Sequence, residues 1–271
     1  MMRQAWIGIM MGVCLGLVGE IAAAGTAGDI PLPGGTELAW RSYVVPQAAR
    51  AYHNLVALPP DYNSALMIGG YGLIGTITVP VNPETKGYGV VGFDAWSSMN
   101  GSQWFRAGDP GPATSRFHAG LVELNSMLYL VGGQGGSEED TFSTGQVWSS
   151  SDGANWTLLT DTAPWGPRQN MAVAAFDGKI WVIGGMDPSA SETPGSPGFA
   201  VFPPDIWSSS DGRAWELVTP SAPWGGCFGS QAVVFNNQLW LVGGLFTGPY
   251  GVGVKASETE VWYTYDGLNW Y

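Results

Sequence analysis

The chain has 271 residues and a formal net charge of −12, and it is rich in Gly (41), Trp (14) and hydrophobic residues (45%). This apolar content can build a sizeable core and excludes a disordered chain, and the length fits one large all-β domain or two small domains. The negative charge argues against nucleic acid and anionic membranes as partners, because both repel an acidic protein.

Residues 1–24 have the pattern of a secretory signal peptide. Arg3 supplies a positive start, residues 5–18 are apolar, and Ala22-Ala23-Ala24 provides the small residues that signal peptidase requires. We expect cleavage after Ala24 and a secreted or periplasmic protein with no stable membrane insertion. The alternative is a membrane anchor, but an apolar run of this length spans about 21 Å as a helix, less than a bilayer core of about 30 Å.

The next two segments lead into the main domain. Residues 25–36 are expected to form a flexible linker. Residues 37–45, which include Trp40, resemble a fourth strand that lacks its own repeat, so they are suited to pair with the last repeat and close a ring. Cys227 is the only cysteine after the leader, which excludes an intrachain disulfide in the mature chain.

One pattern recurs four times along the rest of the chain. Each copy has an apolar run ending in Gly-Gly, a variable stretch, a strand with a central Trp, a tight turn and a second Trp. The central Trp residues, at 96, 148, 207 and 262, are spaced by 52, 59 and 55 residues, and the second Trp residues lie at 104, 156, 215 and 270. The repeats are expected at about 50–109, 115–162, 167–220 and 226–271. We interpret these Trp residues and Gly pairs as structural.

The third repeat shows how one unit is expected to fold. Residues 171–176 form a first strand, and Asp177-Gly178 is a two-residue hairpin signal. Residues 179–183 form a second strand with apolar residues in succession, which indicates that both of its faces are buried. After a long loop, residues 205–210 and 214–218 form the third and fourth strands. Four antiparallel strands per unit are typical of a propeller blade.

The apolar-Gly-Gly ending, the later strand, the final Trp and the preceding Arg116 and Arg168 resemble the kelch-repeat family. The resemblance covers about residues 37–271 and includes the galactose-oxidase-like type and bacterial secreted kelch proteins with Ser-Ser-Asp-Gly turns. It implies an all-β, kelch-type β-propeller of four-stranded antiparallel blades. A weaker likeness to the sialidase Asp-box fails in spacing, because Gly212 directly follows Asp211.

About four blades are present, whereas six or seven are usual for the kelch family. Two interpretations of this number remain. The chain is a fragment of a larger propeller, which its abrupt ending at Tyr271 favours, or four units close or associate with another chain.

The binding site is expected on one end of the propeller. Tight connections gather at the opposite end, whereas the long second-to-third connections share one face. These long connections are residues 71–93, 134–145, 186–204 and 245–259.

Six residues near this face are candidate ligand contacts. Arg116 and Arg168 could bind a carboxylate, or each could bond to neighbouring carbonyl groups. His53 and His118 are taken to hold equivalent places at the start of their first strands, where they could ligate a metal or pack near the axis.

Trp165 and Trp224 lie in the Ala-Pro-Trp-Gly links, where they could stack on a sugar or pack between blades. The acidic residues 138–140 could bind a cation or form a solvated loop. We predict no catalytic residues, no metal site and no cofactor.

The sequence therefore predicts a non-catalytic module that binds a protein or a glycan through the long-loop face. The alternative is a carbohydrate-active enzyme such as a sialic acid mutarotase, which the kelch resemblance implies, with Arg116 and Arg168 meeting the sugar carboxylate. The resemblance to galactose oxidase would imply copper held by His and Tyr with a Tyr–Cys crosslink, but the chain has only two His residues. A structural role at the cell surface is the third hypothesis.

Overall fold

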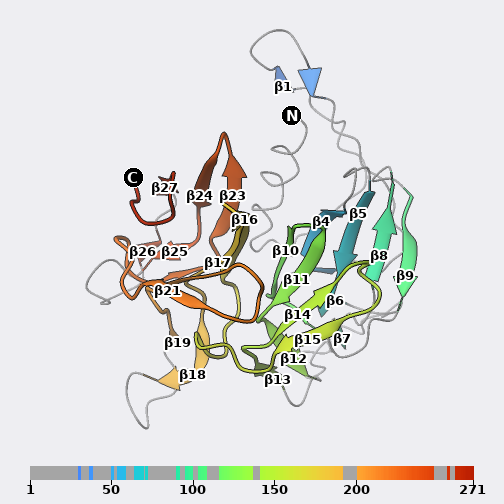
Figure 1. Ribbon diagram of the computed structural model, residues 1–271, viewed down its shortest axis with the longest axis horizontal. Helices are drawn as coiled ribbons and strands as arrows, with labels where there is room; N and C mark the ends of the chain where they lie inside the picture. Colours follow the sequence, from blue (N-terminus) through green and yellow to red (C-terminus); the bar gives the residue numbers. More distant parts are fainter. Residues whose placement is uncertain are drawn as a thin grey trace, which may run out of the picture.

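The structure is a computed structural model that describes residues 30–31, 37–38, 50–51, 54–58, 64–69, 71–72, 90–91, 95–99, 103–108, 116–136, 141–191, 200–246, 255–256 and 260–271. Within these ranges the chain is all-β, and its antiparallel sheets follow one another as the blades of a propeller (Figure 1). Among the described residues, no helix has the length and apolarity needed to cross a membrane. The predicted signal peptide lies outside the described residues.

Three blades have four strands each, paired in sequence order. The first blade contains β4 (Asn54–Leu58), β5 (Ser64–Ile68), β8 (Ala95–Ser98) and β9 (Phe105–Gly108). The second contains β10 (Gly120–Leu124), β11 (Met127–Val131), β14 (Val147–Ser150) and β15 (Thr157–Thr160). The third contains β16 (Ala172–Phe176), β17 (Lys179–Ile183), β20 (Ile206–Ser209) and β21 (Glu216–Thr219).

The fourth blade contains β23 (Gln231–Phe235), β24 (Gln238–Val242) and β27 (Val261–Thr264). The place of its fourth strand is taken by Trp270-Tyr271, since the backbones of Tyr263 and Tyr271 exchange two hydrogen bonds of 2.9 Å. The predicted four-bladed arrangement of antiparallel sheets is confirmed.

Two-residue turns join the first and second strands of the later blades, as predicted. Both turn residues have positive φ, for example 49° at Asp177 and 69° at Gly178, which suits a hairpin between twisted strands. Asn125-Ser126 and Asn236-Asn237 adopt the same conformation.

The second strand of each blade is the centre of the core. In β17, Ile180 and Val182 pack toward the second blade, whereas Trp181 and Ile183 pack toward the fourth. All four side chains are buried, because neighbouring blades cover both faces of the strand. This confirms the expectation drawn from successive apolar residues.

Each blade also carries a small auxiliary sheet, which the sequence did not predict. These sheets are built from β3 (Arg50–Ala51), β6 (Tyr71–Gly72) and β7 (Val90–Val91) in the first blade, β12 (Gln134–Gly136) and β13 (Thr141–Ser143) in the second, β18 (Asp187–Ser191) and β19 (Ala200–Val201) in the third, and β22 (Cys227–Phe228), β25 (Leu245–Phe246) and β26 (Lys255–Ala256) in the fourth. The predicted long loops are therefore partly ordered as strands.

The N-terminal segment differs from expectation in its described part. β1 (Ile30–Pro31) pairs with β2 (Glu37–Leu38), so the expected linker contains a strand. Glu37–Leu38, the described residues of the expected closing strand, pair with Ile30–Pro31 and not with the last blade. The rest of that segment lies outside the described residues.

Candidate functional site

The two ends of the propeller differ in construction. One end carries the tight first-to-second hairpins, such as the tip of β23–β24 at the top of Figure 1. The other carries the auxiliary sheets, of which β12–β13 and β18–β19 lie at the bottom of the same view. We call this second end the auxiliary-sheet face. It is the face on which the long connections were predicted to gather.

Gly-Gly pairs separate the auxiliary sheets from the blades. In the third blade, Gly184 and Gly185 have φ of 59° and 98°, a left-handed conformation that turns the chain out of the blade. A Cβ atom on Gly184 would lie 2.4 Å from Cys227 Sγ of the next blade, and the N–H of Gly185 donates to the carbonyl of Cys227 at 2.8 Å. The pair is therefore required both by the turn and by the close approach of the next blade.

A second backbone ladder joins the blades at the start of their first strands. The N–H of Asn170 donates to the carbonyl of His118 at 2.8 Å, and the N–H of Gly229 donates to the carbonyl of Asn170 at 3.0 Å. All three residues have positive φ, from 54° to 71°, and all are half-buried. The ladder fixes the inner rim of the auxiliary-sheet face, and the different side chains at equivalent places make this rim asymmetric.

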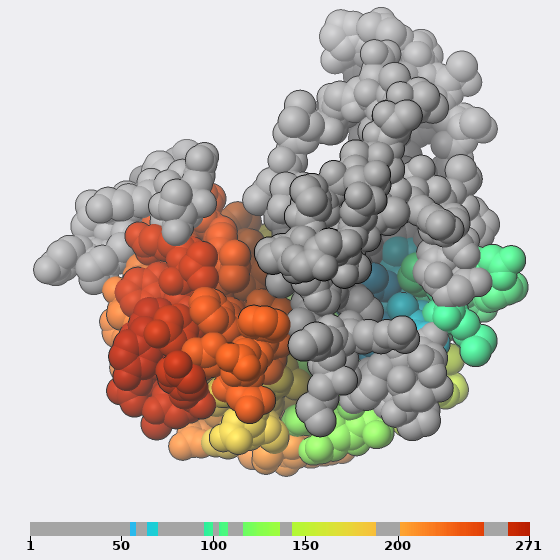
Figure 2. Space-filling model, turned by 90° about the horizontal axis from the view of Figure 1, so that it is seen from above, coloured from blue at the N-terminus to red at the C-terminus, as the bar shows by residue number. Residues whose placement is uncertain are grey.

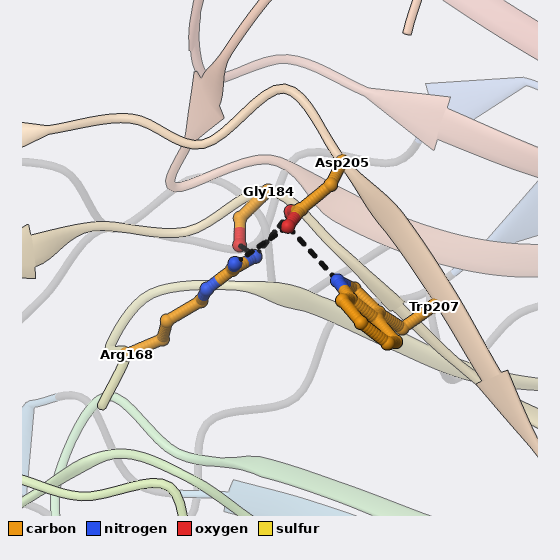
Figure 3. A network of polar contacts seen from close by, with 4 residues as sticks. All are labelled: Arg168, Gly184, Asp205 and Trp207. Carbon is orange, nitrogen blue, oxygen red and sulfur yellow. Dashed lines mark hydrogen bonds and ion pairs between the residues drawn. The ribbon is translucent and has the colours of Figure 1, made fainter. Parts of the chain in front are cut away.

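Arg168 is part of a buried network that ties together one blade (Figure 3). Its guanidinium donates to Asp205 in a bidentate pair, Nη1 to Oδ1 at 2.5 Å and Nη2 to Oδ2 at 2.7 Å. Nη1 also donates to the carbonyl of Gly184 at 3.2 Å, and the indole Nε1 of Trp207 donates to Asp205 Oδ2 at 2.9 Å.

Arg116 repeats this arrangement in the second blade. It donates to the carbonyl of Gly132 at 3.0 Å and to Gln146 Oε1, which also accepts from Trp148 Nε1 at 3.2 Å. Burial lowers the pKa of Arg116 to about 10, so it stays charged at neutral pH.

Both guanidinium groups are thus buried and bonded to protein groups. This geometry matches the structural alternative, in which each Arg bonds to neighbouring groups. It corrects the hypothesis of a ligand carboxylate at Arg116 and Arg168, because a ligand would have to break these bonds to reach them.

Cys227 takes the corresponding place in the fourth blade. The carbonyl of Cys227 accepts a hydrogen bond from the N–H of Gly185 at 2.8 Å. The carbonyl of Arg168 accepts the equivalent bond from the N–H of Gly133, also at 2.8 Å. The thiol is buried, which raises its pKa to about 11. The position that Arg116 and Arg168 hold is therefore filled by Cys227 in this blade.

The two histidines do not occupy equivalent positions. Ile68 and Val131 are the last residues before the Gly pairs of the first and second blades. Ile68 pairs with Asn54 of β4, and Val131 pairs with Gly120 of β10, so Asn54 and Gly120 hold equivalent positions. Counting back from Asn54 and Gly120 places Tyr52 at the position of His118 and aligns His53 with Ala119, so the predicted equivalence is wrong. His53 itself lies outside the described residues.

His118 contacts the third blade through its side chain. Nδ1 lies 3.4 Å from Gln169 Oε1, and the ring meets Phe117 edge-on at 4.8 Å. Burial lowers the pKa of His118, and the contact with Gln169 opposes this shift in part, so the imidazole is neutral at pH 7. Among the described residues, no three His, Cys, Asp or Glu side chains cluster in a way that could hold a metal ion. Residues 138–140 lie outside the described ranges.

Trp165 and Trp224 are buried between blades. Trp165 meets Trp215 edge-on at 5.7 Å, and Trp224 meets Trp270 edge-on at 4.9 Å. Neither indole presents a free face, which corrects the hypothesis that they stack on a sugar; the packing alternative fits this geometry.

An aromatic pair that the sequence analysis missed lies beside the rim instead. Phe228 of β22 and Phe202, which follows β19, are both half-buried, with ring centroids 5.5 Å apart. Phe228 follows the Cys227 position and directly precedes Gly229 of the ladder. Its position next to Gly229 could have identified Phe228 as a candidate from the sequence, whereas no sequence feature identifies Phe202.

The turns before the final Trp residues form a third repeated network. Asp152 Oδ1 accepts from the N–H groups of Ala154 and Asn155 at 2.9 and 2.7 Å, and Ser150 Oγ accepts from Gly153 at 2.8 Å. These bonds lower the pKa of Asp152 well below its ordinary value. Equivalent bonds surround Asp211 and Asp266 and lower their pKa values also.

Comparison with known proteins supports the repeat type. The chain is 30% identical over 142 residues to alpha-scruin of Limulus polyphemus, covering 52% of this chain and 14% of that protein. It is 41% identical over 66 residues to human Kelch-like protein 30, covering 24% of this chain and 11% of that protein. The chain therefore spans only a small part of these curated relatives, and no protein-family profile matches it.

A solved structure, that of YjhT, has a similar fold. The TM-score is 0.58 at 15% sequence identity, and the match covers 88% of this chain and 79% of YjhT. At this identity the likeness concerns the fold alone.

Proposed function

We propose that this kelch-repeat β-propeller is a recognition module that binds a protein or a glycan through its auxiliary-sheet face. The observation that carries the proposal is the separation made by the Gly-Gly pairs. Before each pair, the first and second strands of the blades pack against neighbouring blades, whereas after it the chain forms small sheets and connections of unequal length. A rigid scaffold that holds varied connections at one end is the usual architecture of a binding surface.

The half-buried side chains at the rim supply the expected contacts. Phe202 and Phe228 offer an apolar patch, and the side chain of Asn170, whose carbonyl accepts from Gly229 next to Phe228, can donate and accept hydrogen bonds. An aromatic anchor with a polar neighbour is a common composition for the centre of a recognition site. These residues replace Arg116, Arg168, Trp165 and Trp224, which are buried in structural contacts.

The geometry favours recognition over the sialic acid mutarotase alternative. That alternative needed Arg116 and Arg168 to meet a sugar carboxylate, and both already donate to protein acceptors. Secretion or periplasmic location stays a prediction from residues 1–24, and it would expose this face to extracellular proteins and glycans.

The test is a binding screen against immobilised glycans and against proteins of the secreting cell's surroundings. We expect one class to bind, and we expect Phe228→Ala and Asn170→Ala each to weaken that binding at least tenfold. Glu216→Ala, at an exposed position on β21 away from the rim, is the matched control and should leave binding unchanged. Equal binding by all three variants would contradict the assignment of this face.

A further inference from the structure

A row of side chains crosses the auxiliary sheets of the second, third and fourth blades. Within each blade its members lie directly opposite one another in antiparallel pairs, so their side chains lie on the same face of the sheet. We call this the rim row; it consists of Phe117, Gln134 and Ser143 in the second blade, Gln169 and Met186 in the third, and Phe228 and Leu245 in the fourth. Figure 2 shows these three blades in succession, from green through yellow to orange and red.

The rim row is polar where the second blade meets the third. The N–H of Arg168 donates to the carbonyl of Thr144 at 3.3 Å, which brings their neighbours Gln169 and Ser143 together. β13, which ends at Ser143, also lies beside β18 of the third blade. His118 completes this group, since its Nδ1 lies 3.4 Å from Gln169 Oε1. We call Ser143, Gln169 and His118 the polar junction.

The next interface has an aromatic pair in the same two positions. Ser143 and Phe202 each lie three residues before the side chain that accepts from the buried Arg of its blade. Phe228 follows the Arg position as Gln169 does, and its ring contacts Phe202. The N–H of Gly229 donates to the carbonyl of Asn170 at 3.0 Å, and these residues directly follow Phe228 and Gln169. The polar junction and the aromatic pair are therefore neighbours.

The polar junction has hydrogen-bonding capacity that the protein does not use. Ser143 Oγ is buried and has no hydrogen-bond partner. Gln169 is only 4% exposed, and the described residues provide no acceptor for its Nε2. Buried polar groups in native proteins are almost always hydrogen-bonded. Two such groups at one junction therefore indicate a hydrogen-bonding partner that comes from outside the chain.

The charge of this region favours a neutral partner. No residue of the rim row carries a formal charge, and burial lowers the pKa of His118, which keeps its imidazole neutral. Arg116 and Arg168 are already bonded within their blades, and the chain has a net charge of −12. An anionic ligand would thus meet no available cation at the polar junction and would be repelled by the protein as a whole.

The chemistry of the two neighbouring groups matches a sugar. A carboxamide and a hydroxyl both donate and accept hydrogen bonds, as the hydroxyl groups of a sugar do. The faces of aromatic rings carry partial negative charge, so they attract the C–H groups on the apolar side of a sugar ring. One unit of an oligosaccharide can therefore bond to Ser143 and Gln169 while the next unit packs on Phe202 and Phe228.

We propose that the polar junction and the adjacent aromatic pair bind a neutral oligosaccharide. Ser143 Oγ and Gln169 Nε2 bond to the hydroxyl groups of one sugar unit, and Phe202 and Phe228 hold its neighbour. This inference rests on the proposed function and names its ligand class: an uncharged glycan, in preference to a protein or an acidic glycan.

The experiment is calorimetric titration of the full chain with cellopentaose, maltopentaose, mannopentaose and galactopentaose. Pentagalacturonate is the acidic counterpart of the last probe. We expect at least one neutral pentasaccharide to bind and pentagalacturonate not to bind. Ser143→Ala should weaken the binding about fivefold, because it removes one hydrogen bond to the sugar. Ser143→Thr keeps the hydroxyl group and should keep the affinity.

Ser208→Ala is the matched control. Ser208 Oγ is also buried and without a partner, but it lies in β20, within the core of the third blade and away from the rim row. Neither Ala variant breaks a hydrogen bond within the protein, so both should unfold at or above the wild-type temperature. Only Ser143→Ala should weaken sugar binding.

Three results would overturn the inference: no neutral pentasaccharide binds, pentagalacturonate binds more tightly than all of them, or Ser143→Ala binds as tightly as wild type. Binding of a protein that Phe228→Ala weakens, without any sugar binding, would refute the neutral oligosaccharide and leave the proposed function standing. A ligand whose affinity is unchanged by both Phe228→Ala and Ser143→Ala would contradict both proposals.

Discussion

Arg168 and Asp205 form a bidentate ion pair inside the third blade, and this pair joins the start of the first strand to the start of the third. Asp205 also accepts the indole N–H of Trp207, so one carboxylate orients both an Arg and a Trp of the repeat. Two sequence features of the repeat, the Arg before the first strand and the Trp in the third strand, thus belong to a single hydrogen-bonded network. That network explains why Arg168 is held away from ligands.

Removing Arg168 should strongly destabilise the propeller. Arg168→Ala leaves the Asp205 carboxylate and the Gly184 carbonyl without their buried donor, a change that costs about 3–5 kcal/mol in comparable buried pairs. Urea denaturation followed by Trp fluorescence measures the loss. Lys179→Ala is the control, because Lys179 and Glu216 form an exposed pair at 3.4 Å, and it should cost less than about 1 kcal/mol.

Gly184→Ala should separate close contact from backbone strain. A methyl group at Gly184 would meet Cys227 Sγ and its carbonyl, and φ is 59°. Gly178 has a similar φ of 69°, but nothing lies within 4 Å of an added Cβ. Gly178→Ala should therefore cost only the strain of about 1–2 kcal/mol, and Gly184→Ala should cost more by about 1–3 kcal/mol of overpacking. Equal unfolding midpoints for the two variants would argue against the contact.

The Cys227 thiol should be unreactive in the folded chain. Burial raises its pKa to about 11, so at pH 8 almost none of it is thiolate. On a Cys14→Ser background, a chromogenic disulfide reagent should label less than a tenth of the thiol in buffer and all of it in denaturant. Rapid labelling of the folded chain would contradict the burial of Cys227.

Acid should weaken the Asx-Gly turns. Hydrogen bonds from Asn155 and Ala154 depress the folded pKa of Asp152, so its contribution to stability is present above the unfolded pKa of about 3.9 and is lost as pH falls through the folded pKa. Asp152→Asn should therefore reduce the loss of stability between pH 6 and pH 2.5, measured by urea denaturation. Asn155→Ala removes one side-chain donor and brings the folded pKa of Asp152 closer to its unfolded value, so the loss of stability over the same pH range should also be smaller than in wild type. An identical pH profile for wild type and Asp152→Asn would refute this account.

The blades could be predicted from sequence because their signals are strong and repeated. Buried second strands such as β17 are apolar on successive residues, and turns such as Asp177-Gly178 require positive φ. The auxiliary sheets escaped notice because their strands are as short as Leu245–Phe246 and have no periodicity to read.

The candidate site was harder to predict for a similar reason. Arg168 and Trp165 were singled out by residue type, but burial decides their role, and burial depends on the neighbouring blade. His53 was matched to His118 because both are histidines. The register of β4 and β5, which pairs Asn54 with Ile68, instead shifts His53 by one position relative to His118. The same register aligns Arg50 with Arg116, a match that spacing from the Gly pair hides, because five residues separate β4 from β5 and only two separate β10 from β11.

The two glycines that follow each second strand separate the part of the chain that packs between blades from the part that forms the auxiliary-sheet face. A substitution before the pair, such as one at Ile183, disturbs the packing against the neighbouring blade. Segments after the pair, such as β18, can lengthen or change composition at little cost to the fold. Insertions that follow Gly185 should be tolerated, and the same insertions before Gly184 should not. The molecule is thus a natural frame for grafting new surface segments, one in each blade.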